Sequence, residues 1–442
     1  MPSRAWSGIF SPRLNEALDG LQDPRDPEAI DYALRTILWT PILMFLCRLG
    51  SRRQIGHRLN TARVAAYLSR IARQELARVP HGDTVADVLV HLSVEALAQV
   101  RTDLVRQLIQ KRRLENFRLL DRDYLFTLDG TGHVVYGHEP SPFTEGCLTA
   151  KLSSGETLYY RPVLEAKLVT RTGLALSVET EFLQNPPRRE GQSPEDYKQD
   201  CELKGAYRLL PRLKEAFPEL SVCLLLDGLY AGEPFFALAE TLRWNFLVVL
   251  AEGSLPTVQR EFEALIALQP RNRKLHTTKK AHQVIRWVNG IAYGKRALHV
   301  LECVDTPKDG SKPTRWLWVT NIPITPENAL SLANEGGRQR WRTENEGFNV
   351  QKKGGYAMEH AYAEHPTAAR NFYLLLQIAH LFAQLFEAHL GGKKDVTHEC
   401  GSLHNLADDL LEALRTDPLP SDEDIETFLN TPIQVRLDVD SS

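Results

Sequence analysis

The sequence predicts a mixed α/β protein, in which a helical N-terminal domain precedes a sheet interrupted by an insertion of further strands. Residues 1–120 carry apolar side chains at helical spacing, which predicts an all-α domain. Residues 121–250 alternate between strand and helix patterns, which predicts a sheet flanked by helices. Residues 251–322 contain short aromatic-rich strand patterns, 323–392 return to helix, and 393–442 form an acidic tail.

The N-terminal domain is predicted to contain helices over residues 29–49, 58–76 and 85–120. Residues 51–120 hold 13 Lys and Arg against 6 Asp and Glu, and four Arg lie within 52–63, a candidate helix-turn-helix. Such a basic face suits DNA phosphates, although a solvated helix surface has the same composition. We expect a DNA-binding or dimerisation domain.

The first part of the sheet region alternates between strands and helices. Strands are expected at 124–129, 156–169, 174–183, 220–226 and 245–250, with a hairpin turn at 170–173. Helices are expected at 194–217 and 234–242. This order predicts an α/β sheet with an antiparallel portion.

The insertion begins with a basic run that includes Arg271, Arg273 and Lys274, and strand patterns with tryptophans follow it. Cations beside exposed aromatic rings suit DNA, because the cations bind phosphates and the rings stack on unpaired bases. Trp287 is a candidate for such stacking, whereas Trp316 and Trp318 share one strand face and are expected in the core.

The remaining chain is predicted to be helical and then acidic. Residues 326–353 have the pattern of one polar helix, with acids interleaved among cations. Residues 401–442 hold 2 Lys and Arg against 10 Asp and Glu, so the charge of the chain is polarised although its net value is −3.

Several classes of protein are disfavoured by the sequence. The six cysteines form no CxxC pair, which argues against a zinc ribbon or a disulfide framework and favours a reducing cytoplasm. Neither a signal peptide nor an uninterrupted membrane-spanning run is expected. His398, Cys400 and His404 are expected in a surface loop, and the phosphate-binding loop of ATP-driven motors is missing.

Two aspartates mark the candidate chemistry. Asp129 and Asp227 each follow an apolar strand pattern and each precede a glycine. Strand ends that meet at one sheet edge would bring both carboxylates together, and such a pair binds Mg²⁺ in phosphoryl transfer. An Asp-Gly pair after a strand is also a common turn, so each residue alone is weak evidence. Glu344 and Glu346 in the polar helix are candidates for a third carboxylate.

With these motifs, the chain resembles the DDE transposases of bacterial insertion sequences, in the group whose ribonuclease H-like core is interrupted by strands before the final glutamate. The resemblance covers about residues 110–390 and rests on the segments around Asp129, Asp227 and Glu344. The spacings of 98 and then 117 residues leave room for the insertion.

The third acid is ambiguous within the motif Y-x2-R-x3-E-x6-K that this group often carries. Arg340 with Glu344 matches the Arg-Trp-x-x-Glu context, whereas Arg342, Glu346 and Lys353 match the spacing from arginine to lysine. Helical geometry favours the second register, because these residues share one stripe. We favour Glu344 and keep Glu346 as the alternative.

The resemblance implies a transposase that cuts transposon ends and joins them to target DNA. Asp129, Asp227 and Glu344 or Glu346 would hold Mg²⁺, with Mn²⁺ able to replace it. DNA contacts are implied or expected at Arg340, Arg342, Lys352, Lys353, Trp287, Arg271, Arg273 and Lys274. The expected partners are double-stranded DNA with terminal inverted repeats, target DNA and a second copy of the chain, in a bacterial cytoplasm at the nucleoid. A ribonuclease H-like nuclease and a non-catalytic DNA-binding descendant are the alternatives.

Overall fold

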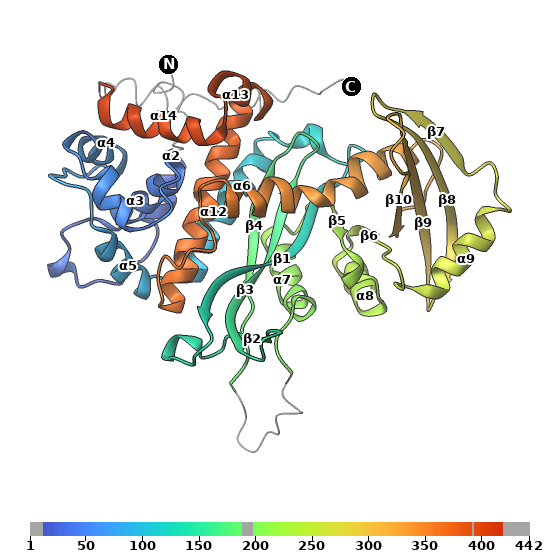
Figure 1. The fold of residues 1–442 in the computed structure, drawn as a ribbon, viewed down its shortest axis with the longest axis horizontal. Helices are drawn as coiled ribbons and strands as arrows, with labels where there is room; N and C mark the ends of the chain where they lie inside the picture. Colours follow the sequence, from blue (N-terminus) through green and yellow to red (C-terminus); the bar gives the residue numbers. More distant parts are fainter. Residues whose placement is uncertain (1–11, 188–197, 391–392, 419–442) are drawn as a thin grey trace.

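The computed structural model describes residues 12–187, 198–390 and 393–418, and the statements below concern these residues. A helical region at the N-terminus is followed by a ten-stranded mixed sheet with its helices, and then by C-terminal helices (Figure 1). The coarse prediction of a mixed α/β protein with an N-terminal helical region is confirmed.

The N-terminal region contains five α-helices. They are α2 (Pro12–Asp19), α3 (Leu34–Leu46), α4 (Ala62–Ala72), α5 (Gly82–His91) and α6 (Val94–Gln110). The candidate helix-turn-helix segment holds only the short π-helical turn η3 (Ile55–Leu59) before α4. Short 3₁₀ turns lie at Pro27–Ala29 (η2), Glu115–Phe117 (η4) and Pro142–Thr144 (η5).

The helical region packs on a long helix from the other end of the chain. Helix α12 (Pro366–His389) contacts α3, α5 and α6, and most of its side chains are buried (Figure 1). The Asn371 side-chain amide donates to the carbonyls of Leu89 and Leu92, which ties α12 to the end of α5. Among the described residues, no helix is both long and apolar enough to cross a membrane.

The sheet combines parallel and antiparallel pairs. Its first six strands are β1 (Tyr124–Gly137), β2 (Leu148–Lys151), β3 (Thr157–Val169), β4 (Ala175–Phe182), β5 (Val222–Leu226) and β6 (Asn245–Val249). Strands β1, β5 and β6 pair in parallel, whereas β3 pairs antiparallel with β1, β2 and β4. Two helices precede and follow β5, namely α7 (Glu202–Ala216) and α8 (Glu233–Leu242).

The inserted strands continue this sheet. They are β7 (Arg273–Thr277), β8 (Ala281–Tyr293), β9 (Arg296–Pro307) and β10 (Thr314–Thr320), preceded by helix α9 (Pro256–Ile266). Strand β10 pairs with β6 on one side and with β9 on the other (Figure 1). Trp318 is fully buried and stacks on the partly buried Trp316, in line with their expected core position.

The prediction of one regular helix over 326–353 is wrong. The chain instead forms α10 (Ala329–Ser331), η7 (Leu332–Gly336), η8 (Gly337–Trp341), η9 (Thr343–Phe348) and α11 (Asn349–Lys353), in which π and 3₁₀ turns alternate. A Cβ at Gly336 would approach Leu247 to 2.6 Å, and one at Gly337 would collide with Trp318. The segment is therefore pressed against the sheet, and this contact overrides a regular helical winding.

The start of the predicted acidic tail folds. Helices α13 (Lys393–Cys400) and α14 (Leu403–Thr416) pack on each other, and α14 also contacts α4. The rest of the acidic stretch, from residue 419 onward, lies outside the described residues.

Candidate active site at the acidic edge of the sheet

The first acid lies within a strand and not at its end, which corrects the prediction from sequence. Strand β1 continues to Gly137 because β3 pairs with it along almost its whole length. On its other side, β1 pairs with β5 only from Tyr124 to Thr127. Asp129 therefore lies where β1 extends beyond its parallel neighbour, and one flank of the strand is open there.

The second acid lies level with the first. Thr127 is opposite Leu225 in the parallel register, so two further residues along each strand place Asp129 level with Asp227. Asp227 follows β5, and its Oδ1 accepts a hydrogen bond of 2.9 Å from the Leu229 amide at the start of the 3₁₀ turn η6 (Gly228–Tyr230). The charge of Asp227 contributes to raising the pKa of Asp129, so the two carboxylates lie near each other where β5 ends.

The irregular helix brings Glu344, and not Glu346, towards Asp129. Thr343 is fully buried, and its hydroxyl contacts the hydroxyl of Thr127 on β1. The negative charge of Glu344 contributes to raising the pKa of Asp129. Glu346 instead accepts from Arg342 Nη1 at 3.4 Å, four residues earlier in the chain. The geometry therefore favours the first of the two sequence registers.

The electrostatics of Asp129 reflect a crowded acidic site. The pKa of Asp129 is raised to about 6, mainly by burial; Arg340 opposes the rise, and the charges of Glu344 and Asp227 contribute to it. Arg340 Nη1 lies 3.9 Å from Asp129 Oδ2. One partly exposed arginine offsets several carboxylates, so the site has an excess of negative charge.

A fourth carboxylate, Glu202, was missed by the sequence reasoning. Glu202 is the first residue of α7, and its carboxylate lies against the backbone of Gly130, where a Cβ would collide with it. Burial raises the pKa of Glu202, and Asp129 and Asp227 raise it further. An acid in the first turn of a helix is common, so no local pattern distinguishes Glu202 from the acids at ordinary helix starts.

Tyr230 completes the surroundings of the acids. Its side chain is 2% exposed, and its hydroxyl has no hydrogen-bond partner among the described residues. Burial raises the pKa of Tyr230, and so do the charges of Glu202, Asp227 and Asp129. The hydroxyl is thus buried close enough to the acidic edge to be influenced by these three carboxylates.

The donor set fits a hard divalent cation in its chemistry. Carboxylate oxygens are the ligands that Mg²⁺ and Mn²⁺ prefer, and the excess negative charge at Asp129 is what a cation would neutralise. Within residues 12–187, 198–390 and 393–418, no three Asp, Glu, His or Cys side chains already form a metal-binding group. The edge therefore offers suitable ligands that are not drawn together into a closed cage.

The predicted DNA-binding cations of the irregular helix differ in how available they are. Arg340 faces the acidic edge, where it is the arginine nearest Asp129. Arg342 is held by Glu346 and by the Arg171 carbonyl at 2.9 Å, and burial lowers its pKa. Arg342 therefore has a structural role in this conformation.

The two lysines at the end of the same segment also differ. Lys352 Nζ pairs with Glu359 at 3.2 Å. Lys353 is exposed at the end of α11. Of the two, Lys353 has the side chain more open to an external phosphate.

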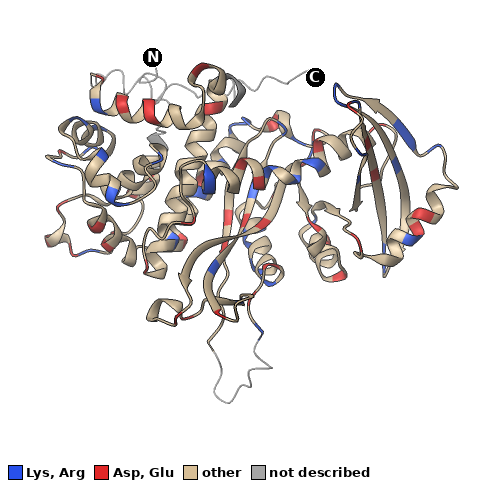
Figure 2. Ribbon diagram, viewed as in Figure 1, with Lys and Arg blue, Asp and Glu red and all other residues tan. Residues whose placement is uncertain are grey.

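In the insertion, the predicted DNA-binding arginines lie on the surface, whereas the tryptophan predicted to stack on bases is buried. Arg271 and Arg273 are exposed, and Lys274 Nζ donates to the Pro326 carbonyl at 2.7 Å. Figure 2 shows Lys and Arg positions, in blue, along the inserted strands. Trp287 is 2% exposed and packs in the core of the sheet. The expectation that Trp287 stacks on bases is therefore corrected, because a ring buried on both faces presents no surface to a base.

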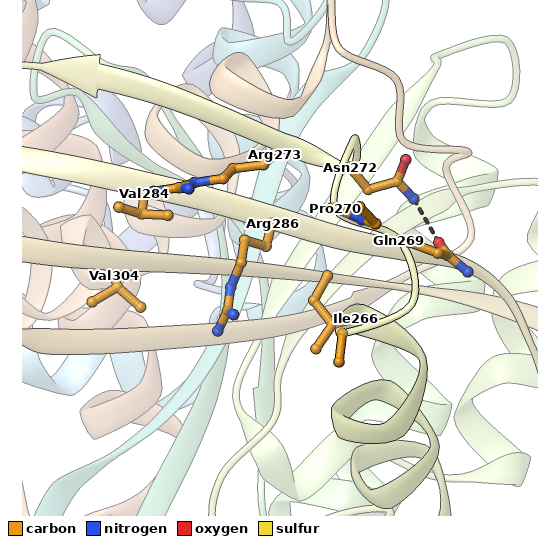
Figure 3. Close-up of a pocket in the computed structure, with 9 residues that line it drawn as sticks. Ile266, Gln269, Pro270, Asn272, Arg273, Val284, Arg286 and Val304 are labelled. Carbon is orange, nitrogen blue, oxygen red and sulfur yellow. Dashed lines mark hydrogen bonds between the residues drawn. The ribbon is translucent and has the colours of Figure 1, made fainter.

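A cavity of about 450 Å³ opens beside these cations, between the end of α9 and strands β7 to β9. Arg273 and Arg286 both line it (Figure 3). Arg286 also pairs with the buried Glu302 at 2.5 Å. The cavity lies on the insertion and is lined by none of the four acids of the edge.

Comparison with known protein families finds no match for the chain, and comparison with curated proteins finds none either. The fold and the site define the protein as a mixed α/β protein with a carboxylate-rich edge on its sheet.

Proposed function

We propose that this protein is a DDE-type DNA transposase, which cuts DNA at transposon ends and joins the ends to target DNA. The observation that carries the proposal is the set of charges around Asp129: Asp227 lies level with it on the adjacent parallel strand, and Glu344, next to the buried contact of Thr343 with Thr127, also raises its pKa. Acids separated by 98 and 117 residues have no local reason to converge.

The architecture supports a ribonuclease H-like core with an insertion. A mixed sheet carries the first two acids, and strands β7 to β10 lie in the chain between Asp227 and the segment that carries Glu344. This is the arrangement that the sequence resemblance implies for the group with strands before the final glutamate.

In the proposed mechanism, Asp129, Asp227 and Glu344 would hold Mg²⁺, with Mn²⁺ able to replace it. When bound, such an ion would supply activation of the attacking oxygen and stabilisation of the leaving oxygen in phosphoryl transfer. Arg340, 3.9 Å from Asp129, limits the repulsion among the acids and is placed to contact a phosphate. The protein contributes positioning and charge neutralisation, which is the general logic of this chemistry.

The proposed partners follow from the same reaction. The exposed Arg271, Arg273 and Lys353 supply phosphate contacts to the DNA, and the N-terminal helical region supplies further contacts or the dimer interface. Two ends must be cut together, so the active form is a homodimer on DNA in a bacterial cytoplasm. Mass photometry of the end-bound complex tests this, and a monomer on DNA would contradict it.

The decisive experiment is cleavage and strand transfer on DNA that flanks the gene, with Mg²⁺ or Mn²⁺. Asp227→Asn and Glu344→Gln should each lower the cleavage rate more than about 100-fold. This loss exceeds the one expected for residues that only support the metal ligands. Glu346→Gln, which removes the charge paired with Arg342, should stay within about fivefold of wild type. Cut ends that are never joined would favour a nuclease, and DNA binding without any metal-dependent cutting would favour a non-catalytic DNA-binding protein.

A further inference from the structure

Glu202 occupies an unusual position for a residue at a helix start. A first-turn glutamate favours the helix through the helix dipole whether or not it points into solvent. Here the side chain is instead half-buried over the backbone of Gly130, the residue that follows Asp129. Only a glycine at position 130 leaves room for this carboxylate, because a Cβ would overlap with it.

No cation compensates Glu202 in the described part of the chain. Arg340 pairs with Asp129 and not with Glu202. Among the described residues, no hydrogen bond or ion pair involves the Glu202 carboxylate. The charges of Asp129 and Asp227 add to the effect of burial in raising its pKa. A carboxylate that is partly removed from water beside like charges costs free energy unless something positive joins it.

The buried hydroxyl of Tyr230 is a second, independent sign of a missing polar component. The side chain is 98% removed from solvent, and its oxygen has no hydrogen-bond partner. An unpaired buried hydroxyl costs about 1–3 kcal/mol. A hydrated cation at the acidic edge would bring both positive charge and hydrogen-bonding water to this place.

We propose that Glu202 is a fourth cation-binding carboxylate of the acidic edge, with the buried Tyr230 hydroxyl as a donor to the water that hydrates the cation. This inference rests on the proposed function, because it assumes that Asp129, Asp227 and Glu344 bind the cation. It adds a ligand from a helix that precedes the second acid, so that four separate elements of the fold supply the site.

The test is Mn²⁺ binding to the full chain without DNA, measured by isothermal titration calorimetry and by the Mn²⁺-induced rise in melting temperature. Glu202→Gln should weaken Mn²⁺ binding at least about 10-fold, as expected for a residue of the metal site. Tyr230→Phe should weaken it by a smaller factor without lowering the stability of the metal-free protein. Glu215→Gln, an exposed acid on the same helix, is the matched control and should bind Mn²⁺ as wild type does.

The outcomes separate this inference from the proposed function. If Asp129→Asn and Asp227→Asn abolish Mn²⁺ binding while Glu202→Gln equals the control, Glu202 is not a ligand and only the inference fails. If Asp129→Asn and Asp227→Asn also bind Mn²⁺ normally, the metal site and with it the proposed function fail. Should Glu202→Gln not fold, Glu202→Asp retains the charge but withdraws it by one methylene, and unchanged affinity in that variant would equally overturn the inference.

Discussion

The ion pair between Arg101 and Glu165 is the strongest test of how the helical region supports the sheet. Both side chains are fully buried, and Arg101 Nη1 lies 3.5 Å from Glu165 Oε1. Arg101 comes from α6, while Glu165 lies on β3 directly opposite Asp129. The substitution Arg101→Met removes the guanidinium and keeps an unbranched apolar side chain.

Breaking a buried pair by removing one partner costs about 3–5 kcal/mol, because the other charge stays buried without compensation. Glu165 would keep three hydroxyl donors, from Ser177, from Thr180 at 2.9 Å and from Tyr373 at 2.7 Å. These hydroxyls replace part of the hydrogen bonding that water would give the carboxylate. We therefore expect a loss of stability at the lower end of that range, about 3 kcal/mol.

Urea unfolding followed by circular dichroism measures the loss of stability in Arg101→Met. The double variant Arg101→Met/Glu165→Gln removes both charges and should regain at least half of the stability, because no charge then remains buried at the pair. Lys352→Met is the control, since it breaks a more exposed pair with Glu359 and should cost less than about 1 kcal/mol. If Arg101→Met costs no more than Lys352→Met, the buried pair does not hold the helical region to the sheet.

Three further predictions concern stability. His133 is buried, and its pKa is about 4 in the folded protein against 6.5 in the unfolded chain, so the unfolded chain binds the proton first and stability falls as pH falls through this window. The loss of stability attributable to this group is about 2.5 kcal/mol between pH 8 and 4.5. It is measured as the difference between the urea unfolding of wild type and of His133→Phe, and equal pH profiles of the two proteins would refute it. Gly337→Ala should cost about 1–3 kcal/mol by overpacking against Trp318, whereas Gly132→Ala, which meets open space, should be nearly neutral in the same thermal melts. Trp287→Ala should cost about 3–5 kcal/mol as a core truncation, and a stable variant that only loses DNA affinity would reinstate the base-stacking role.

The sequence predicts the core strands well because their signals are local. The runs that become β5 and β6 are apolar and bounded by turns, and the hairpin of β3 and β4 has its own turn residues. By contrast, β7 (Arg273–Thr277) was missed because its alternation is polar and two of its side chains are cations, so the basic run concealed a strand.

The site was predicted in part for the same physical reason. Asp129 and Asp227 follow apolar strand runs, which is a local signal, and their common edge follows from parallel pairing. Helical periodicity could not decide between Glu344 and Glu346, because the segment is not a regular helix. Its π turns change which side chains share one face. Glu202 depends wholly on a contact between distant parts of the chain.

The pairing of β10 with β6 has a consequence for any attempt to shorten the protein. An appended domain can be excised at its linker, but removing residues 251–322 would strip β6 (Asn245–Val249) of its antiparallel partner. The bared strand is almost entirely apolar, and its unpaired amides and carbonyls would form a template for other chains. A truncated protein would thus be expected to aggregate through β6, so the insertion also protects the sheet against self-association.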